Sequence, residues 1–228
     1  MTKILVVAEM AVREVLRRRS VLVLLLLLPL AFYFSRRGDA YWQSVRFVCL
    51  GIGWALSTAA LFAASGARAI EPRLRLTGYA THHLYLGRLL AMWAVGLVLS
   101  APYWLLIRLD LEQVRHGAVA LILLLTVLIS APFGLAVSAL LPRELEGMLV
   151  LLTVVAMQMM LNPEGTAAYL LPYWFSREIG IYAIETDGAV SHVFTGLAHA
   201  GIVLTVLLAV VALTSGLRLR RRGHLRFA

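Results

Sequence analysis

Residues able to bind a metal are scarce in this chain, and their spacing is poor for that purpose. His82 and His83 are neighbours, and adjacent residues on a helix point about 100° apart, so the pair is badly placed to chelate one ion. Glu71 is eleven residues from His82, and the single cysteine, Cys49, excludes a disulfide framework or a cysteine metal cluster. We expect no metal site, and a structural or interfacial role for three scattered histidines, His116, His192 and His199.

Catalytic motifs are equally hard to find. The sequence has no Gly-x-Ser-x-Gly, no His-Glu-x-x-His and no cluster of aspartates, so nothing favours a membrane-embedded enzyme. A Walker A motif requires Gly-Lys-Ser/Thr, and the only lysine is Lys3. We therefore predict that the chain has no catalytic residue, binds no cofactor and hydrolyses no ATP itself.

Composition accounts for this scarcity. Of 228 residues, 61% are hydrophobic and 14% are charged, and the mean hydropathy is +0.85. An average soluble domain is about 45–50% apolar and about 25% charged, so a soluble enzyme or a nucleic-acid-binding domain does not fit. The net charge of +9 lies beside long apolar runs, which indicates membrane topology and not a nucleic-acid partner.

Six stretches without Asp, Glu, Lys or Arg predict an all-α, polytopic membrane protein with six transmembrane helices. A spanning helix needs about 20 apolar residues, with about 17–25 the usual range. The first stretch is short, but arginines at both of its ends can snorkel to the two interfaces. The stretches are Ser20–Ser35, Phe47–Ala67, Leu89–Ile107, His116–Pro142, Gly147 up to Glu164, and Gly188–Leu217.

These stretches make residues 1–228 a single transmembrane domain: an interfacial helix (1–19), the spans (20–217) and a basic cytoplasmic tail (218–228). Placing both termini in the cytoplasm puts fifteen of the 21 basic residues inside, as the positive-inside rule requires. The rival interpretation is a cleaved signal peptide, but its basic region would be unusually long and Leu30–Phe34 offers no small-x-small cleavage site. The preference for arginine over lysine suggests a GC-rich bacterial genome, and hence an inner-membrane location.

Residues 2–18 predict an amphipathic helix that lies in the membrane interface. At about 100° per residue, the charged residues fall on one side, although Val6, Val7 and Met10 blur it. Two roles stay open for this helix: a basic topology anchor, or a cytoplasmic collar that also touches a partner. The opposite, apolar side carries Ile4, Leu5, Ala8, Ala11, Val12, Val15 and Leu16.

The longest loop on the proposed cytoplasmic side is Arg68–Arg88. Pro72 suits a helix start, and Thr77-Gly78 suits a break between two short helices. The loop carries more apolar residues than contact with water alone would favour: Leu74, Leu76, Tyr79, Leu84 and Tyr85. It either packs on the rim of its own protein or forms a docking surface for a partner.

The last external loop, from Asn162 to about Thr195, is rich in aromatic residues. Aromatic side chains are typical of the membrane–water interface, so a belt of anchors is one interpretation. Leu170–Ile184 is also apolar enough to dip into the bilayer as a re-entrant segment before the last span, where it would form a gate or exit. Ionisable residues are nearly missing from the spans, which argues against coupling to an ion gradient.

This layout resembles the membrane subunits of type-2 ABC exporters over essentially the whole chain. The amphipathic N-terminal helix, the six spans and the long loop after the second span all match. Within that loop, Glu71, Leu76-Thr77-Gly78 and Gly87-Arg88 are similar to the family's Glu…Leu-Thr-Gly/Pro…Gly-Lys/Arg pattern. Leu141–Gly147 is similar to the family's connection between the fourth and fifth spans.

The resemblance implies a permease subunit that works with a second copy or a paralogue and with separate P-loop ATP-binding subunits, which would hold ATP and Mg. Closure of those subunits would push on the loop, so exchanging Glu71 for Arg is expected to abolish coupled ATPase activity without unfolding the permease. The expected contact residues are Arg13, Glu14, Arg17, Glu71, Arg73, Arg75, Thr77, Gly78 and Tyr79.

The resemblance also implies a pathway between two copies, lined by the second and fifth spans. An apolar lining would suit a lipophilic cargo, and methionines adapt to varied shapes, although they are also ordinary core residues. The expected lining residues are Trp54, Phe62, Met157, Met159 and Met160. The alternatives are a membrane scaffold without transport and a membrane-embedded enzyme.

Overall fold

The described residues of this computed structural model form ten helices and no strand. They are residues 2–17, 19–37, 41–68, 70–141, 143–162, 164–185 and 188–218. The predicted all-α class is confirmed, whereas the predicted basic tail lies almost wholly outside the described residues. The helices are α1 (Lys3–Arg17), α2 (Arg19–Ser35), α3 (Tyr41–Ala67), α4 (Glu71–Leu76), α5 (Thr81–Asp110), α6 (His116–Leu140), α7 (Glu144–Met160), α8 (Thr166–Tyr169), α9 (Phe175–Ile184) and α10 (Val190–Arg218).

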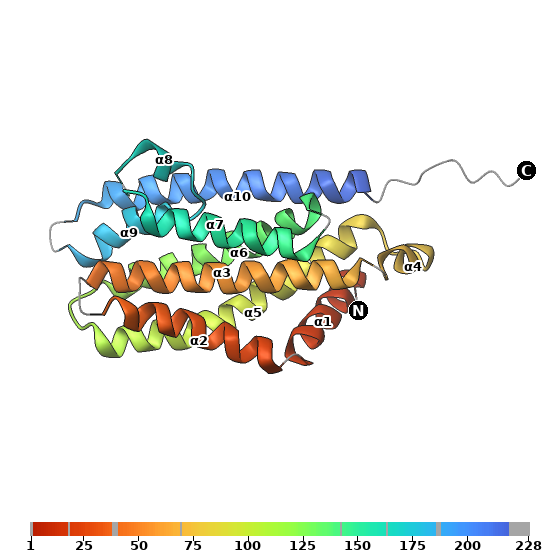
Figure 1. Ribbon diagram of the computed structural model, residues 1–228, viewed down its shortest axis with the longest axis horizontal. Coiled ribbons are helices and arrows are strands. Elements are labelled where there is room, and N and C mark those ends of the chain that lie inside the picture. Colours follow the sequence, from red (N-terminus) through yellow and green to blue (C-terminus); the bar gives the residue numbers. More distant parts are fainter. Residues whose placement is uncertain are drawn as a thin grey trace, which may run out of the picture.

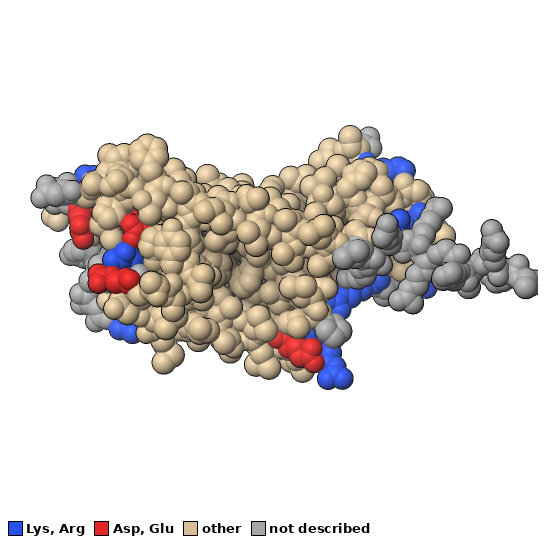
Figure 2. All heavy atoms as spheres, turned by 90° about the horizontal axis from the view of Figure 1, so that it is seen from above, with Lys and Arg blue, Asp and Glu red and all other residues tan. Residues whose placement is uncertain are grey.

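The long axis of the molecule is roughly the common direction of α2, α3, α5, α6, α7 and α10 (Figure 1). The short α4 and the start of α1 lie at one end of this bundle, where α10 also ends, and α8 and α9 lie at the other end. Charged side chains gather toward the two ends of the face shown in Figure 2, and a band without them lies between. This distribution is what a bilayer requires of the surface that it covers.

Four helices are long and apolar enough to cross a membrane: Gln43–Ala67, Thr81–Asp110, His116–Leu140 and Ser191–Gly216. The chain is therefore compatible with membrane embedding through at least these four. The helices α2 and α7 run beside them but have 17 residues each, at the short end of the range for a span.

The centre of the bundle is α3, which packs most extensively on α6. Gly134 of α6 makes this close approach possible, because a Cβ atom there would lie 2.0 Å from the backbone oxygen of Ser57. Small residues at helix-packing spacing let two backbones meet in this way. Three small residues of α3 at helical spacing, Ala55, Ala59 and Ala63, are buried as well.

Two helices, α3 and α5, extend beyond the charge-free stretches that predicted them, because they include arginines whose side chains have partners. The helix α3 begins at Tyr41, and Arg46 within it donates to the backbone oxygen of Gln158 at 2.5 Å. In α5, Arg88 pairs with a carboxylate and Arg108 lies over the ring of Trp104. The fifth predicted stretch is shifted toward the N-terminus: α7 begins at Glu144, before Gly147, and ends at Met160, before Glu164.

The helix α1 is amphipathic as predicted, but its buried face is rotated from the predicted one. Leu5 and Leu16 were expected on the apolar face, and their side chains are 50% and 55% exposed. Val7, expected to blur the polar face, is buried. The reason lies in α5, where Gly87 lets α1 approach so closely that a Cβ atom would lie 2.6 Å from that of Val7. The residues of α1 that are buried are Val7, Ala11 and Val15.

Candidate functional site

The segment between α3 and α5 forms a short helix and a tight turn at one end of the bundle. The helix α4 begins at Glu71 with Pro72 in its first turn, and Gly78 has a positive φ of 86°, a conformation that glycine adopts without strain. The predicted start at Pro72 and the break at Thr77-Gly78 are confirmed. The expected second short helix is instead the first part of α5, which begins at Thr81 and continues without interruption.

An enclosed ion pair holds α4 against α5. Arg88 of α5 donates to the carboxylate of Glu71, and the two side chains are only 8% and 3% exposed. A buried charge without a partner would be costly, so each of these groups needs the other. Glu71 is therefore not on the surface, where a residue in direct contact with a partner would lie, and its side chain positions α4.

Lys3 joins the beginning of α1 to the same turn. Its ammonium donates to the backbone oxygen of Gly78 at 2.7 Å and lies 5.5 Å from the ring centroid of Tyr79. At the start of α5, the backbone N–H of Ala80 donates to Nδ1 of His83 at 3.1 Å, so His83 caps this helix. We call α4, the turn Thr77–Tyr79 and the beginning of α1 the collar surface.

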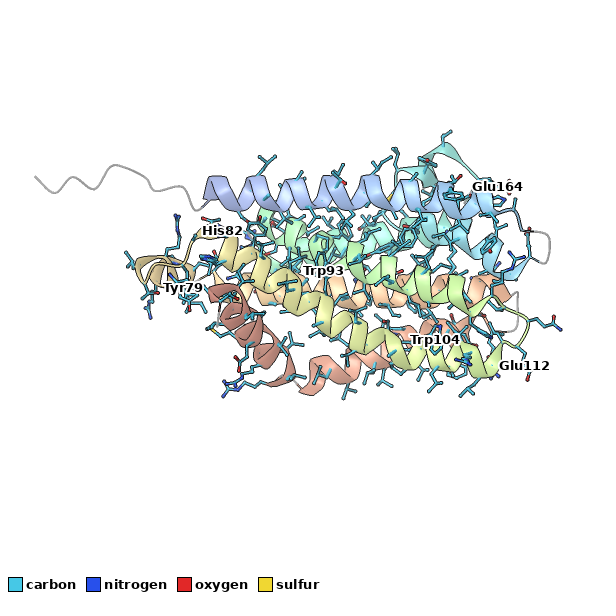
Figure 3. The ribbon with its side chains drawn as sticks, turned by 180° about the vertical axis from the view of Figure 1, so that it is seen from behind. Tyr79, His82, Trp93, Trp104, Glu112 and Glu164 are labelled. Carbon is cyan, nitrogen blue, oxygen red and sulfur yellow. The ribbon has the colours of Figure 1, made fainter. Side chains whose placement is uncertain are left out.

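The structure separates the predicted contact residues into two groups. In the collar surface, Arg73, Thr77 and Gly78 are exposed and Arg75 and Tyr79 are partly exposed; Figure 3 shows Tyr79 at this end of the molecule. Arg13, Glu14 and Arg17 lie near the other end of α1. Because a helix rises about 1.5 Å per residue, ten residues place Arg13 about 15 Å along α1 from Lys3.

Leu76, named from the sequence among the apolar residues of this loop but not among the expected contact residues, is the most exposed large apolar side chain in the described part of the chain. Its side chain is 90% exposed at the last position of α4. It lies directly before the break at Thr77-Gly78, where few neighbours cover a side chain. A singly exposed apolar side chain is ordinary on a protein surface, so the feature that sets Leu76 apart is that an enclosed ion pair anchors the helix that carries it.

The predicted pathway residues lie along the contact between α3 and α7. Trp54 and Phe62 of α3 are half-buried and pack against a small apolar cluster of Leu61, Val137 and Leu151. Met157 and Met160 of α7 are 45% and 86% exposed, whereas Met159 packs against the main core. The structure thus brings the two aromatic residues together with α7 and leaves two of the three methionines facing outward.

The segment at the opposite end reaches inward to a hydroxyl cluster that sequence reasoning missed. Tyr173, in the turn between α8 and α9, places its hydroxyl 3.1 Å from Ser57 of α3 and 3.0 Å from Ser130 of α6. Its backbone N–H donates to the side chain of Gln158 at 3.2 Å. Gly53 gives the ring its space, since a Cβ atom there would lie 2.7 Å from it. The expected aromatic belt of this loop therefore includes a fully buried tyrosine.

Charged residues around α9 also connect with each other and with α10. Glu178 lies 2.7 Å from Nδ1 of His192 and accepts a bond of 2.5 Å from Arg177, which also lies 3.3 Å from Glu164. His192 was expected to be structural or interfacial, and it joins α10 to α9 here. The available signal for such a network was Arg177, the single arginine among the acidic residues of 164–192.

The two ends of the bundle therefore differ in what they expose. One end carries the anchored helix α4 with an exposed side chain, whereas the charged residues around α9 at the other end bond to one another. Among the described residues, no group of three or more His, Cys, Asp or Glu side chains is placed to hold a metal ion. The chain matches no family model and no curated protein.

Proposed function

We propose that the chain is the membrane-spanning permease subunit of an ATP-driven exporter of the type-2 ABC class, acting as a dimer. In this proposal α2 and α7 are the first and fifth of six spans, and the end that carries the collar surface faces the cytoplasm. The common direction of the six helices in Figure 1 supports this topology. The places of the two chain ends support it too. An even number of spans brings a chain back to the side where it began, and α1 begins at the same end of the bundle where α10 ends (Figure 1).

The observation that carries the proposal is the anchored α4 with its exposed Leu76. A helix of six residues is too short to be stable alone in water, so the Glu71–Arg88 pair and the contact from Lys3 must hold it in place. A helix that is anchored at its first residue and exposes an apolar side chain at its last is suited to bind another protein and to be displaced by it. Since Arg88 belongs to α5, a displacement of α4 would be transmitted to a long helix of the bundle.

The pathway in this proposal runs along the face where α3 meets α7. Trp54 and Phe62 from α3 and Met157 and Met160 from α7 give this face an apolar character. A second copy would complete the pathway, and a lipophilic cargo would match its chemistry. Met159, which was also expected to line the pathway, packs against the core, so its side chain is poorly placed to contact cargo.

The external segment is assigned as re-entrant in this proposal. Ser57 lies near the middle of α3 and Ser130 near the middle of α6, so the hydroxyl of Tyr173 reaches a depth between the ends of two long helices. The turn between α8 and α9 would then enter the outer half of the bilayer. Its backbone groups can do so without exposure to lipid, because buried non-helical backbone is tolerated there when protein covers it.

The test is a mild-detergent pull-down of the tagged full chain from its native cell, followed by an ATPase assay. We expect a P-loop ATPase to copurify in roughly stoichiometric amount and to show vanadate-sensitive hydrolysis. A pull-down of a Leu76→Glu variant tests the collar surface, and Leu109→Glu, which changes an exposed side chain at the other end of α5, is its matched control. Repeated recovery of the chain alone would contradict the proposal and would favour a scaffold without transport.

A further inference from the structure

A groove lined entirely by aliphatic side chains lies where α1, α2 and α5 meet. Its volume is about 360 Å³, within the range of about 300–1,000 Å³ that is usual for small-molecule sites. Figure 3 shows α1 and α2 forming an elbow beside α5. All three helices contribute to the walls of the groove: Val12 and Leu16 from α1, Leu22 and Leu26 from α2, and Ala94 and Val98 from α5.

The groove exists because α1 packs mainly on α5 and very little on α2. It is open along one side, since Leu16, Leu26 and Val98 are 55%, 46% and 76% exposed. Leu26 belongs to the apolar part of α2 and Val98 to the middle of α5, so the open side faces the region that hydrocarbon would occupy. An acyl chain is the occupant whose chemistry matches such walls.

A basic rim adjoins the apolar groove. A second depression on α1 is lined by Met10, Arg13, Glu14, Leu16 and Arg17, and Leu16 belongs to both. Arg13 pairs with Glu9 at 2.5 Å, whereas Arg17 is exposed and has no ion pair among the residues that the structure describes. The sequence from Glu9 to Arg19 contains four arginines and two glutamates, so its charge is positive.

We propose that this groove and its rim bind one anionic glycerophospholipid of the cytoplasmic leaflet. The acyl chain lies between α1, α2 and α5, and the phosphate of the headgroup faces Arg17. The assignment rests on complementarity of shape and charge, because basic residues next to a membrane helix attract anionic lipids by about 1 kcal/mol each. The bound lipid fills the gap between α1 and α2 and so supports the elbow that joins them.

This site does not depend on transport. A scaffold with the same elbow would bind the same lipid, so the pull-down of an ATPase and the lipid measurement can fail separately. Arg13, Glu14 and Arg17 were expected to contact an ATP-binding subunit, and the isolated chain contains none. Lipid retention by the isolated chain therefore reports on the groove alone.

The test is native mass spectrometry of the purified full chain in mild detergent with equal amounts of phosphatidylglycerol and phosphatidylcholine. We expect one retained lipid with a preference for phosphatidylglycerol, and Arg17→Gln should lower that preference about fivefold, the effect of one basic side chain. Arg143→Gln is the matched control, because this arginine is 81% exposed and lies away from the groove.

A second pair of variants tests the apolar groove. Val98→Trp places an indole across the opening and should lower retention of both lipids, whereas Leu97→Trp, at a neighbouring position that is 47% exposed and outside the lining, should not. Ala94→Phe provides the same test one helical turn away if Val98→Trp fails to fold by circular dichroism. Equal retention of the two lipids by the wild type, or unchanged retention in the groove variants, would overturn the proposal. So would a dimer that is weakened by Val98→Trp while lipid retention is unchanged, since the occupant would then be a second copy.

Discussion

Arg88, about two turns into α5, forms an ion pair with Glu71 at the first position of α4, and both side chains are buried. This ion pair connects a surface helix directly to one of the longest helices in the bundle. Its position explains how a six-residue helix can keep a defined place at the end of the molecule. It also changes what a substitution at Glu71 would report, because the variant would alter the folded state as well as any contact with a partner.

We predict that Glu71→Gln lowers the free energy of unfolding by about 3–5 kcal/mol, because Arg88 would keep its charge in an enclosed place without a counter-charge. Glu71→Arg, expected from sequence to leave the fold intact, should lower it at least as much. The reversed pair Glu71→Arg with Arg88→Glu should recover part of the loss. Unfolding in mixed detergent micelles measures each value.

The control for this cycle is Arg73→Gln, which changes an exposed arginine on the same helix. Its effect should stay within about 0.5 kcal/mol, as is usual for surface positions. If the losses from the two single charge reversals simply added in the double variant, Glu71 and Arg88 would not interact and the assigned anchoring would be wrong.

The sequence predicted this loop in part. Glu71 is the single acidic residue between Arg68 and Arg88, so a pair with some arginine was foreseeable from charge alone. The choice of Arg88 was not, because it depends on the turn at Gly78 that folds α4 back toward α5. Three other arginines of the loop were equally available by composition.

The apolar runs in the sequence predicted where the centre of each long helix lies, but not where the helix begins and ends. Apolar runs identify the part of a helix that a bilayer can hold, and each predicted stretch overlaps one observed helix. A charged residue ends such a run in sequence, but it does not end the helix when a partner satisfies it. Arg46, which bonds to the backbone of α7, is the example.

The hydroxyl cluster around Tyr173 could not be predicted, because its members are far apart in sequence. Ser57 and Tyr173 are 116 residues apart, and Ser130 and Tyr173 are 43 apart. Serines in apolar helices are common, and nothing local distinguishes these two. What the sequence did predict was an aromatic, apolar segment before the last long helix, and that segment supplies the tyrosine.

We predict that Leu76→Glu lowers copurification of an ATP-binding subunit at least tenfold while leaving the fold unchanged. The side chain is 90% exposed, so its replacement removes no internal packing, whereas the loss of a hot-spot residue from an interface costs about 2 kcal/mol or more. Quantitative pull-down followed by ATPase assay gives the readout. The control is Leu109→Glu, at a position of α5 that is 75% exposed at the other end of the bundle. Equal recovery of the partner by both variants would remove α4 from the interface.

We predict that Tyr173→Phe lowers the free energy of unfolding modestly, by about 0.6–1.7 kcal/mol, the range measured for hydrogen bonds within membrane proteins. The loss is small because Ser57 and Ser130 also donate to backbone oxygens, of Ser130 and Thr126 respectively. Tyr173→Ala should cost about 3–5 kcal/mol, since it empties a fully buried site. Tyr169→Phe is the control, at a tyrosine that is 46% exposed. Proteolysis of the external segment should increase for Tyr173→Ala alone; equal rates in all three variants would show that Tyr173 does not hold that segment.

The contact between α3 and α6 leads to a prediction about stability that has its own control. The helix α6 carries one glycine within this contact, Gly134, and one outside it, Gly117. At Gly134 an added Cβ atom would lie 2.0 Å from a backbone oxygen of α3, and a backbone atom cannot move aside as a flexible side chain can. Gly134→Ala should therefore separate the two helices and lower the free energy of unfolding by about 1–3 kcal/mol or more, as overpacking does in well-packed cores. At Gly117, in the first turn of α6, an added Cβ atom meets nothing within 4 Å. Gly117→Ala should be neutral or slightly stabilising, since alanine is the better helix former. Unfolding curves of both variants in the same micelles decide the matter: equal stability would mean that α3 and α6 do not approach as closely as their backbones indicate.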